Sequence, residues 1–326
     1  MRVFIFFILL IGILFAFGNV YSPVIFLSPE PLAISPTPVF TPPEDPTPVT
    51  TSDNTIEVTL PASEPEIPTL PTTTPPLEEI AEIIASPIPT QKDYLPSTII
   101  RERTEESIIN FLCKTNDGGS ISATGIIIST DGHILSNAHV SENLKENECL
   151  VRTGSPARNF AYAELLFIPQ KYTDASTDFT RATYDISIWK IIRPVGSTLL
   201  PETFPSLAID YSTVPEANDQ FAVLSYPAEV FGAKTILRSL PLLFTNTEVV
   251  ARSEFFVETK NSLSSQKGSS GGALIDRETT MLRGVIFGVS DAELVAERKL
   301  FSLLPDWISL VVKEETSHTL QEYINL

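Results

Sequence analysis

The segment Gly268–Gly272 has the composition of a loop that could carry a nucleophile. Its sequence is Gly-Ser-Ser-Gly-Gly, and three glycines around two serines allow a tight turn whose backbone can approach a ligand closely. If Ser270 is the nucleophile, its own N–H and that of Gly268 are the natural donors to an oxyanion that develops on a substrate carbonyl. Loops rich in glycine and serine are common without any catalytic role. This segment therefore indicates a nucleophile only if a suitable base and carboxylate lie elsewhere in the chain.

A serine hydroxyl needs a neighbouring base to act as a nucleophile at neutral pH. The chain has three histidines, at positions 133, 139 and 318. His133 lies beside a predicted turn, and His318 lies near the C-terminus, where we expect it to be solvated. His139 lies where an apolar strand gives way to small residues, a position at which an isolated histidine is more often structural than catalytic. It is nevertheless the best candidate base of the three.

The base in turn requires a buried carboxylate, which holds its tautomer and stabilises the imidazolium. Asp185 directly precedes the apolar run 186–191, so it either ends a strand at the solvent or is desolvated against a partner. Asp174 and Asp178 lie in a polar loop and are expected to be solvated. Asp185 is therefore the predicted carboxylate.

Short β-rich runs separated by turn residues recur from residue 108 onward, a pattern that predicts a β-sandwich or β-barrel. The pair Asp131-Gly132 lies between two apolar runs and predicts a hairpin shortly before His139. After Pro305, apolar residues recur at helical spacing and predict a C-terminal helix that packs on the β-domain. The predicted strands are 108–114, 124–129, 133–136, 149–152, 186–192, 221–224, 255–259 and 285–289.

Three segments resemble the signature regions of trypsin-like serine peptidases, especially those of the bacterial HtrA-type branch. Thr124–Val140 resembles the region of the catalytic histidine, Tyr184–Ile188 the aspartate strand, and Gly268–Leu274 the nucleophile loop. The order of these motifs fits the family, as do the gaps of 46 and 85 residues between the three candidate side chains. The resemblance extends over roughly residues 98–312.

The resemblance implies an all-β fold of two packed six-stranded antiparallel barrels, with the active site between them. It implies an endopeptidase that hydrolyses peptide bonds through an acyl-enzyme, with His139, Asp185 and Ser270 as catalytic triad. The N–H groups of Gly268 and Ser270 would form the oxyanion hole. Protein or peptide substrates are implied, and neither a metal nor a cofactor is expected.

Several positions depart from the family pattern. Ser187 stands where the family more often has alanine, and Thr124 where it often has glycine or serine. The residue before the nucleophile is the uncharged Ser269, whereas zymogen-type relatives use an acidic residue there to pair with a freed N-terminus. We therefore expect activity without N-terminal trimming. We expect no PDZ module after the protease domain, and the pattern is compatible with a monomer.

The substrate pocket is predicted from its place along the chain. Its base should come from residues 264–267, including Ser264 and Ser265, and its far wall from residues 287–290, including Phe287, Gly288 and Val289. A buried cationic side chain of a substrate would need a carboxylate partner, and these residues offer none. We therefore expect cleavage after a small or medium uncharged residue. A preference for acidic residues beside Lys267 is the alternative, and Asp291, one residue beyond the wall, leaves the limits of the pocket open.

The first 96 residues are predicted to lie outside the catalytic domain. An apolar run behind Arg2 makes residues 1–27 a signal peptide or an uncleaved N-inside membrane anchor, with a buried helix as a third interpretation. Residues 28–96 are predicted to form a disordered Pro/Thr-rich stalk, because 18 of the 27 prolines lie between Pro23 and Pro96. The protease domain is assigned to residues 97–326, and both main interpretations of the N-terminus place it outside the cytoplasm.

The net charge of −18 argues against nucleic-acid binding, because an acidic surface repels phosphate backbones. The two cysteines, Cys113 and Cys149, lack the spacing of metal ligands. They flank the His139 segment on strands expected to be adjacent, in a compartment that permits oxidation, so we predict a disulfide. Two buried thiols remain the alternative.

Two interpretations compete with an active protease. The chain could be a catalytically inactive trypsin-like fold that serves as a cell-surface binding module, or a stalked adhesin whose glycine- and serine-rich loop is structural. The presence of all three candidate triad residues argues against both. Labelling with a fluorophosphonate would separate an enzyme from a binding module.

Overall fold

The computed structural model describes residues 92–197, 199–292 and 294–326. The predicted membrane segment, residues 1–27, and almost all of the predicted stalk lie outside the described residues. Within the part that is described, no helix is long and apolar enough to cross a membrane. The N–H of Leu95 donates to Arg277 O at 2.8 Å, so the folded part begins before the predicted boundary at residue 97.

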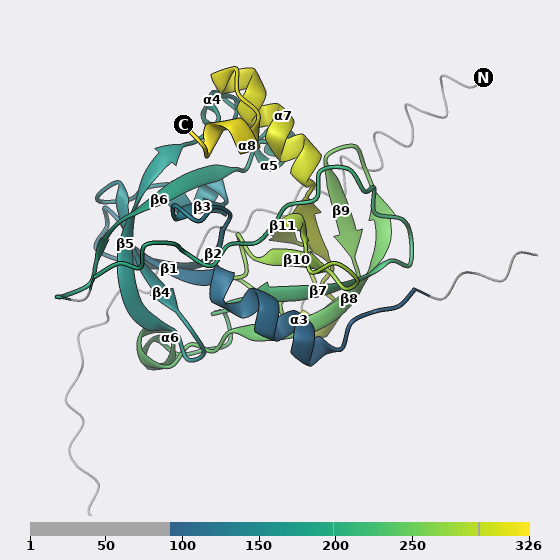
Figure 1. The fold of residues 1–326 in the computed structure, drawn as a ribbon, viewed down its shortest axis with the longest axis horizontal. Coiled ribbons are helices and arrows are strands. Elements are labelled where there is room, and N and C mark those ends of the chain that lie inside the picture. The colour runs from purple at the N-terminus through teal and green to yellow at the C-terminus, as the bar shows by residue number, and fades with distance from the viewer. Residues whose placement is uncertain (1–91, 198, 293) are drawn as a thin grey trace, which may run out of the picture. The chain divides into compact units, whose positions relative to one another are not determined.

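The described strands close into two six-stranded antiparallel barrels, which confirms the expected architecture (Figure 1). Around the first barrel the order is β1-β2-β3-β6-β5-β4, and around the second it is β10-β11-β12-β9-β8-β7. The first barrel consists of β1 (Ile108–Lys114), β2 (Ser120–Ile127), β3 (His133–Ser136), β4 (Glu148–Thr153), β5 (Arg158–Phe167) and β6 (Ser187–Pro194). The second consists of β7 (Gln220–Ser225), β8 (Leu243–Arg252), β9 (Phe256–Thr259), β10 (Ala273–Asp276), β11 (Leu282–Val289) and β12 (Leu300–Leu303).

The hairpin predicted at Asp131-Gly132 is present between β2 and β3. Gly132 has a φ of +85°, a conformation that costs glycine little and other residues more. The turn is closed by bonds from Gly132 N to Ser129 O at 3.0 Å and from Ile128 N to His133 O at 2.9 Å. This tight turn fixes the register of β3 against β2, and therefore the position of the residues that follow β3.

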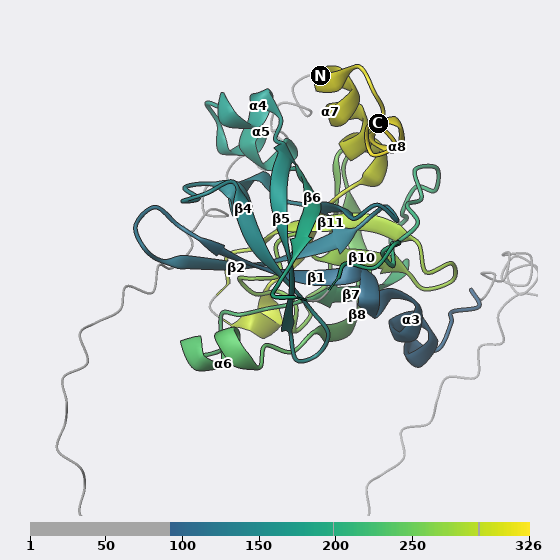
Figure 2. The same cartoon turned by 60° about the vertical axis from the view of Figure 1, so that its left-hand side comes forward.

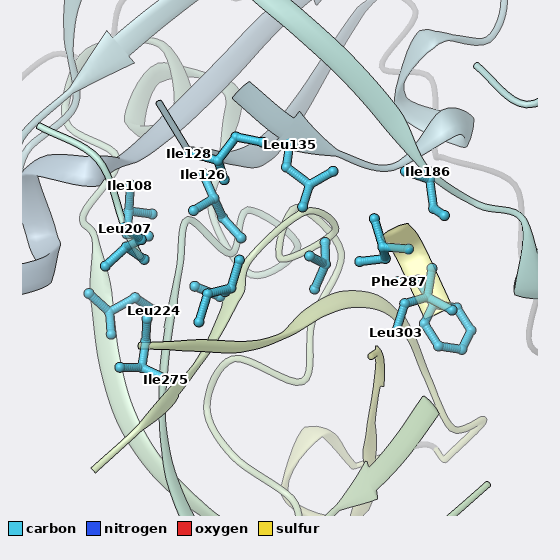
Figure 3. Close-up of a cluster of buried hydrophobic side chains, with 14 of the residues drawn as sticks. Ile108, Ile126, Ile128, Leu135, Ile186, Leu207, Leu224, Ile275, Phe287 and Leu303 are labelled. Atoms are coloured by element: carbon cyan, nitrogen blue, oxygen red, sulfur yellow. The ribbon is translucent and has the colours of Figure 1, made fainter. Parts of the chain in front are cut away.

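A shared hydrophobic cluster packs the two barrels against each other (Figure 3). Ile126 and Leu135 from the first barrel belong to the same cluster as Leu224, Ile275 and Leu303 from the second, and all five side chains are at most 1% exposed. Burying a side chain of this size contributes roughly 1.5–3 kcal/mol. Each barrel has a separate core inside it, so the interface is an additional layer that holds the barrels in one relative position.

The helices are short and lie outside the barrels. They are α3 (Ser97–Thr104), α4 (Gln170–Thr173), α5 (Asp178–Thr183), α6 (Ala233–Arg238), α7 (Pro305–Thr316) and α8 (Leu320–Tyr323), with 3-10 turns η1 (Glu105–Ser107), η2 (Ala138–Ser141) and η3 (Val295–Glu297). Figure 2 shows α4, α5, α7 and α8 together at one end of the molecule, with α6 at the opposite end. The single C-terminal helix predicted from the sequence is thus two helices. The chain breaks at Ser317, which has a φ of +67°, and restarts at a capping box between Thr319 and Glu322.

The predicted disulfide between Cys113 and Cys149 is present. β1 and β4 are paired antiparallel with Phe111 opposite Val151, and the same register places the two cysteines opposite each other. Their Cα atoms are 4.5 Å apart, and the bond spans 36 residues of sequence. For a loop of that length the chain-entropy model gives about 3.8 kcal/mol of stabilisation. The bridge closes the first barrel around the segment that carries His139.

His133 is an ordinary hairpin residue, as predicted, and it is neutral in the folded protein. Burial, with a smaller contribution from Lys190, lowers the pKa of His133 to about 4, from 6.5 for an unperturbed histidine. Its Nδ1 lies 2.8 Å from Ser129 Oγ across the turn.

Acid should therefore destabilise the wild type through His133. Between pH 6.5 and about 4 the unfolded state binds a proton at this residue that the folded state does not, so stability is lost as the pH falls through this window. We expect the difference in Tm between the wild type and a His133→Asn variant to move in favour of the variant as the pH falls from 7 to 4.5. Thermal unfolding across that pH range measures it. A Tm difference that stays constant with pH would contradict the assignment.

Candidate active site

The side chains of His139 and Asp185 meet because the strands beside them are paired. His139 lies in η2, directly after β3, and Asp185 lies directly before β6. β3 and β6 are antiparallel neighbours with Ser136 opposite Ser187, so the residues after β3 and before β6 must lie side by side. His139 Nδ1 is 2.6 Å from Asp185 Oδ2, and the backbone N of His139 donates to Asp185 Oδ1 at 2.9 Å.

This pairing sets the chemistry of the imidazole. The Asp185 side chain is 0% exposed, and both of its oxygens accept bonds from His139. With Nδ1–H donated to the carboxylate, the neutral ring carries its free electron pair on Nε2. The side chain of His139 is 18% exposed, so the imidazole is partly open to solvent. Asp174 and Asp178, the rejected candidates, are exposed as expected.

A chain of hydrogen bonds fixes the backbone of Asp185. Asn137 Nδ2 donates to Asp185 O at 2.9 Å, and Ser187 Oγ donates to Asn137 O at 2.7 Å. Trp189 Nε1 donates in turn to Ser187 Oγ at 2.8 Å. Ser187, which departs from the family's usual alanine, therefore connects the aspartate strand to the segment before His139.

The candidate nucleophile Ser270 lies in a turn that only glycines can complete. Gly268 has a φ of +96° and Gly271 a φ of +79°. A Cβ at Gly271 would lie 2.0 Å from Thr124 O, and one at Gly268 would lie 2.8 Å from Ala228 N. The predicted tight turn with close backbone approach is thus present, and the close approach is to the protein itself.

The backbone around Gly268 leaves two donors free for an oxyanion. Lys267 O accepts from Ala228 N at 2.8 Å and from Glu229 N at 3.2 Å. Within the described residues, the N–H groups of Gly268 and Ser270 donate no hydrogen bond. These two are the donors that the sequence predicted.

Thr124 on β2 connects the first barrel to the nucleophile loop. Its N–H donates to Ser270 O at 2.8 Å, and its Oγ1 donates to Gly268 O at 2.9 Å. The same Oγ1 accepts from Tyr226 N at 2.9 Å, and Thr124 O accepts from Ser136 Oγ at 2.8 Å. A fully buried residue of one barrel thus bonds to both sides of the candidate nucleophile of the other.

The predicted pocket residues divide into a polar and an aromatic group. Ser264 and Ser265 are fully buried in the loop before Gly268, and the Ser264 hydroxyl lies 3.4 Å from Thr245 Oγ1. On β11, the Phe287 ring packs against Phe256 at 5.9 Å between centroids. Gly288 and Val289, the other predicted wall residues, follow on the same strand. Asp291 is exposed beyond the strand.

A cavity of about 460 Å³ lies elsewhere, and none of the predicted site residues lines it. Its lining includes Glu105 from η1, Thr153 from β4, and the apolar side chains of Phe160, Phe204 and Leu242. Among the described residues, no group of histidine, cysteine and acidic side chains could hold a metal ion.

The model of the trypsin-like peptidase domain matches residues 123–285, a segment that includes His139, Asp185 and Ser270. The chain belongs to the trypsin-like peptidase family. At the level of the family, the chain is a serine peptidase, and the family implies peptide substrates.

Solved structures similar to this trypsin-like peptidase include the serine endoprotease from Yersinia pestis, at 18% identity and a TM-score of 0.48, covering 69% of this chain and 68% of that one. The HtrA-type protease AlgW, solved with a tripeptide, matches at 16% identity and a TM-score of 0.48, covering 69% of this chain and 65% of that one. No curated protein matches the chain.

The sequence predicts candidate charged and nucleophilic groups, but it does not predict the side chains that hold them. In the sequence, Thr124 is marked only by its departure from the family pattern. Trp307 lies in α7, where the sequence predicts a helix, and its Nε1 donates to Thr183 O at 2.7 Å, two residues before Asp185. A hydroxyl or indole that bonds to a distant backbone carbonyl leaves no periodic signal along the chain.

Replacing Thr124 with valine should lower kcat/KM for peptide hydrolysis by roughly ten- to hundred-fold, because Gly268 O and Tyr226 N lose a buried partner and a displacement of about 1 Å at the nucleophile can cost a hundred-fold in rate. Thr124→Ser keeps the hydroxyl and should stay within about three-fold of the wild type, since only a methyl group is lost. Steady-state kinetics of the folded variants measures both. Equal rates for the valine and serine variants would show that the hydroxyl does not align the nucleophile loop.

Proposed function

We propose that the chain is an active serine endopeptidase in which His139, Asp185 and Ser270 form the catalytic triad. The observation that carries the proposal is the buried Asp185 carboxylate, which accepts both the ring Nδ1–H and the backbone N–H of His139. This arrangement prepares one imidazole nitrogen as a base, and Thr124 holds the loop of a candidate nucleophile on the adjacent barrel.

In the proposed reaction, Ser270 Oγ attacks the carbonyl carbon of the scissile peptide bond while His139 Nε2 takes the hydroxyl proton. The N–H groups of Gly268 and Ser270 stabilise the oxyanion, and such a donor contributes about 2.7–4 kcal/mol to the transition state. The imidazolium then gives its proton to the leaving amine, and an acyl group remains on Ser270. A water molecule, deprotonated by His139, releases the acyl group and restores the hydroxyl. Asp185 stabilises the imidazolium in both halves of the reaction.

Ser270→Ala and His139→Ala should each lower kcat by several orders of magnitude without unfolding the protein, because each removes a member of a unit that acts together. Asp185→Asn should cost about 10⁴ in kcat, since an amide in that position favours the wrong tautomer of the imidazole. Hydrolysis of a fluorogenic protein substrate measures these effects.

Asp174→Asn is the matched control, since it makes the same chemical change at an exposed aspartate and should leave kcat unaltered. Full peptidase activity in Ser270→Ala would show the triad assignment to be wrong. Loss of activity in the Asp174 control would show that the effect is not specific to the site.

We propose further that cleavage follows small or medium uncharged residues. Ser264 and Ser265 are buried and neutral, Phe287 offers an apolar face, and Lys267 would repel a cationic side chain. A buried ammonium or guanidinium without a carboxylate costs several kcal/mol.

Profiling with a mixed peptide library should therefore return mainly uncharged residues on the acyl side of the cleaved bond. Dominant cleavage after arginine or lysine would show that Asp291 or another carboxylate reaches the pocket. Dominant cleavage after acidic residues would instead assign the selectivity to Lys267.

The proposed place of action is outside the cytoplasm. The apolar N-terminal run supports export or anchoring. The Cys113–Cys149 disulfide is compatible with it, since such bonds persist in oxidising compartments.

A further inference from the structure

Glu229, in the loop after β7, contacts the residue that precedes the proposed oxyanion hole. Its Oε2 accepts from the backbone N of Lys267 at 3.1 Å and from Arg298 Nη1 at 2.7 Å. The backbone N of Glu229 donates to Lys267 O at 3.2 Å, beside the bond from Ala228 N at 2.8 Å. Both polar groups of the Lys267 backbone are therefore held by the 228–229 segment.

Because the peptide bond is planar, fixing the direction of Lys267 C=O also fixes the direction of Gly268 N–H. Lys267 C=O and Gly268 N–H belong to one peptide unit, and in a trans unit they point in opposite directions. When Lys267 O is bonded to the 228–229 segment, the N–H of Gly268 is directed away from that segment. These two bonds come from the backbone N–H groups of the 228–229 segment and set the direction of a predicted oxyanion donor. The Glu229 carboxylate binds Lys267 N, which belongs to the preceding peptide unit.

Arg298 connects a third loop to this contact. It follows η3 and precedes β12, and its Nε donates to Ala292 O at 2.9 Å while Nη1 binds Glu229. The Arg298 and Glu229 side chains are only 16% and 22% exposed. Burial alone would raise the pKa of Glu229, but the bonds from Arg298 and from Lys267 N–H outweigh it and hold the pKa below its usual range.

Ser269, the residue before the candidate nucleophile, brings no charge to this loop. Its hydroxyl accepts from Ser225 Oγ at 3.1 Å, a bond between two neutral groups. An ion pair between this position and a freed N-terminus, as in zymogen-type relatives, cannot form here. The charge that holds this loop comes instead from Glu229, one residue beyond Ala228.

We propose that the Glu229 carboxylate, held by Arg298, is a positioning group. It holds Lys267 through that residue's backbone N–H, and so keeps Lys267 O on the 228–229 segment with the Gly268 N–H directed at the oxyanion. The inference rests on the proposed function of the same site. A well-exposed ion pair would contribute little, whereas this half-buried carboxylate also binds a backbone N–H, so its loss leaves the loop without a partner.

The test compares Arg298→Met, Arg298→Lys, Glu229→Ala and the control Arg193→Met. Arg193 on β6 binds Glu148 on β4 of the first barrel at 2.6 Å, with the two side chains 49% and 33% exposed. Arg298→Met and Glu229→Ala should each lower kcat by roughly ten- to hundred-fold with KM within about two-fold, because the loss falls on a donor to the transition state. Arg298→Lys should recover most of kcat, and Arg193→Met should match the wild type.

Hydrogen exchange over residues 263–272 gives a readout that needs no activity. The Lys267 N–H donates to Glu229, so exchange in this segment should be at least several-fold faster in Glu229→Ala and Arg298→Met than in Arg193→Met. If the wild type hydrolyses nothing, the proposed function fails, and exchange alone decides whether Glu229 fixes the loop. Unchanged exchange, or a kcat equal to that of the Arg193 control, would overturn the inference.

Discussion

The bonds from Thr124 to the backbone of Gly268 and Ser270 are the contact on which the rest of the site depends. The base and its carboxylate belong to the first barrel and the candidate nucleophile belongs to the second, so no single element can align them. The buried interface cluster brings the barrels together, but apolar packing is not directional. Hydrogen bonds from one buried strand residue to both sides of Ser270 supply the direction. A displacement of about 1 Å at such a site can cost a hundred-fold in rate.

The triad candidates could be predicted from the sequence because each lies beside a recognisable local pattern, and because the chain has only three histidines. His139 follows a hairpin marked by Asp131-Gly132, and Asp185 precedes an apolar strand. Eight of the strands were predicted within a few residues, but β5, β8, β10 and β12 were not. β5 and β8 carry polar residues on exposed positions, so pairing with neighbours rather than local pattern makes them strands. The helix break at Ser317 could not be predicted because serine has no strong preference for the left-handed conformation that it adopts there.

The contacts that position the site could not be predicted from the sequence, for a different reason. Thr124 bonds to a carbonyl 144 positions away, and Glu229 binds Arg298 across 69 positions. Periodicity predicts which face of a strand is buried, but it does not say which loops meet once the barrels close. Contacts of this kind connect Glu229, Arg298 and Thr124 around one short loop, and they explain how an uncharged Ser269 can precede an ordered nucleophile.

The activation of Ser270 by His139 is tested most directly by covalent labelling. The full chain would be treated with a fluorophosphonate, which reacts with an activated serine hydroxyl, and the modified residue located by mass spectrometry of the digested protein. The account predicts one adduct, on Ser270, and a labelling rate that falls by orders of magnitude in His139→Ala while the variant stays folded. An adduct on another serine, or equal labelling of Ser270 with and without His139, would contradict it.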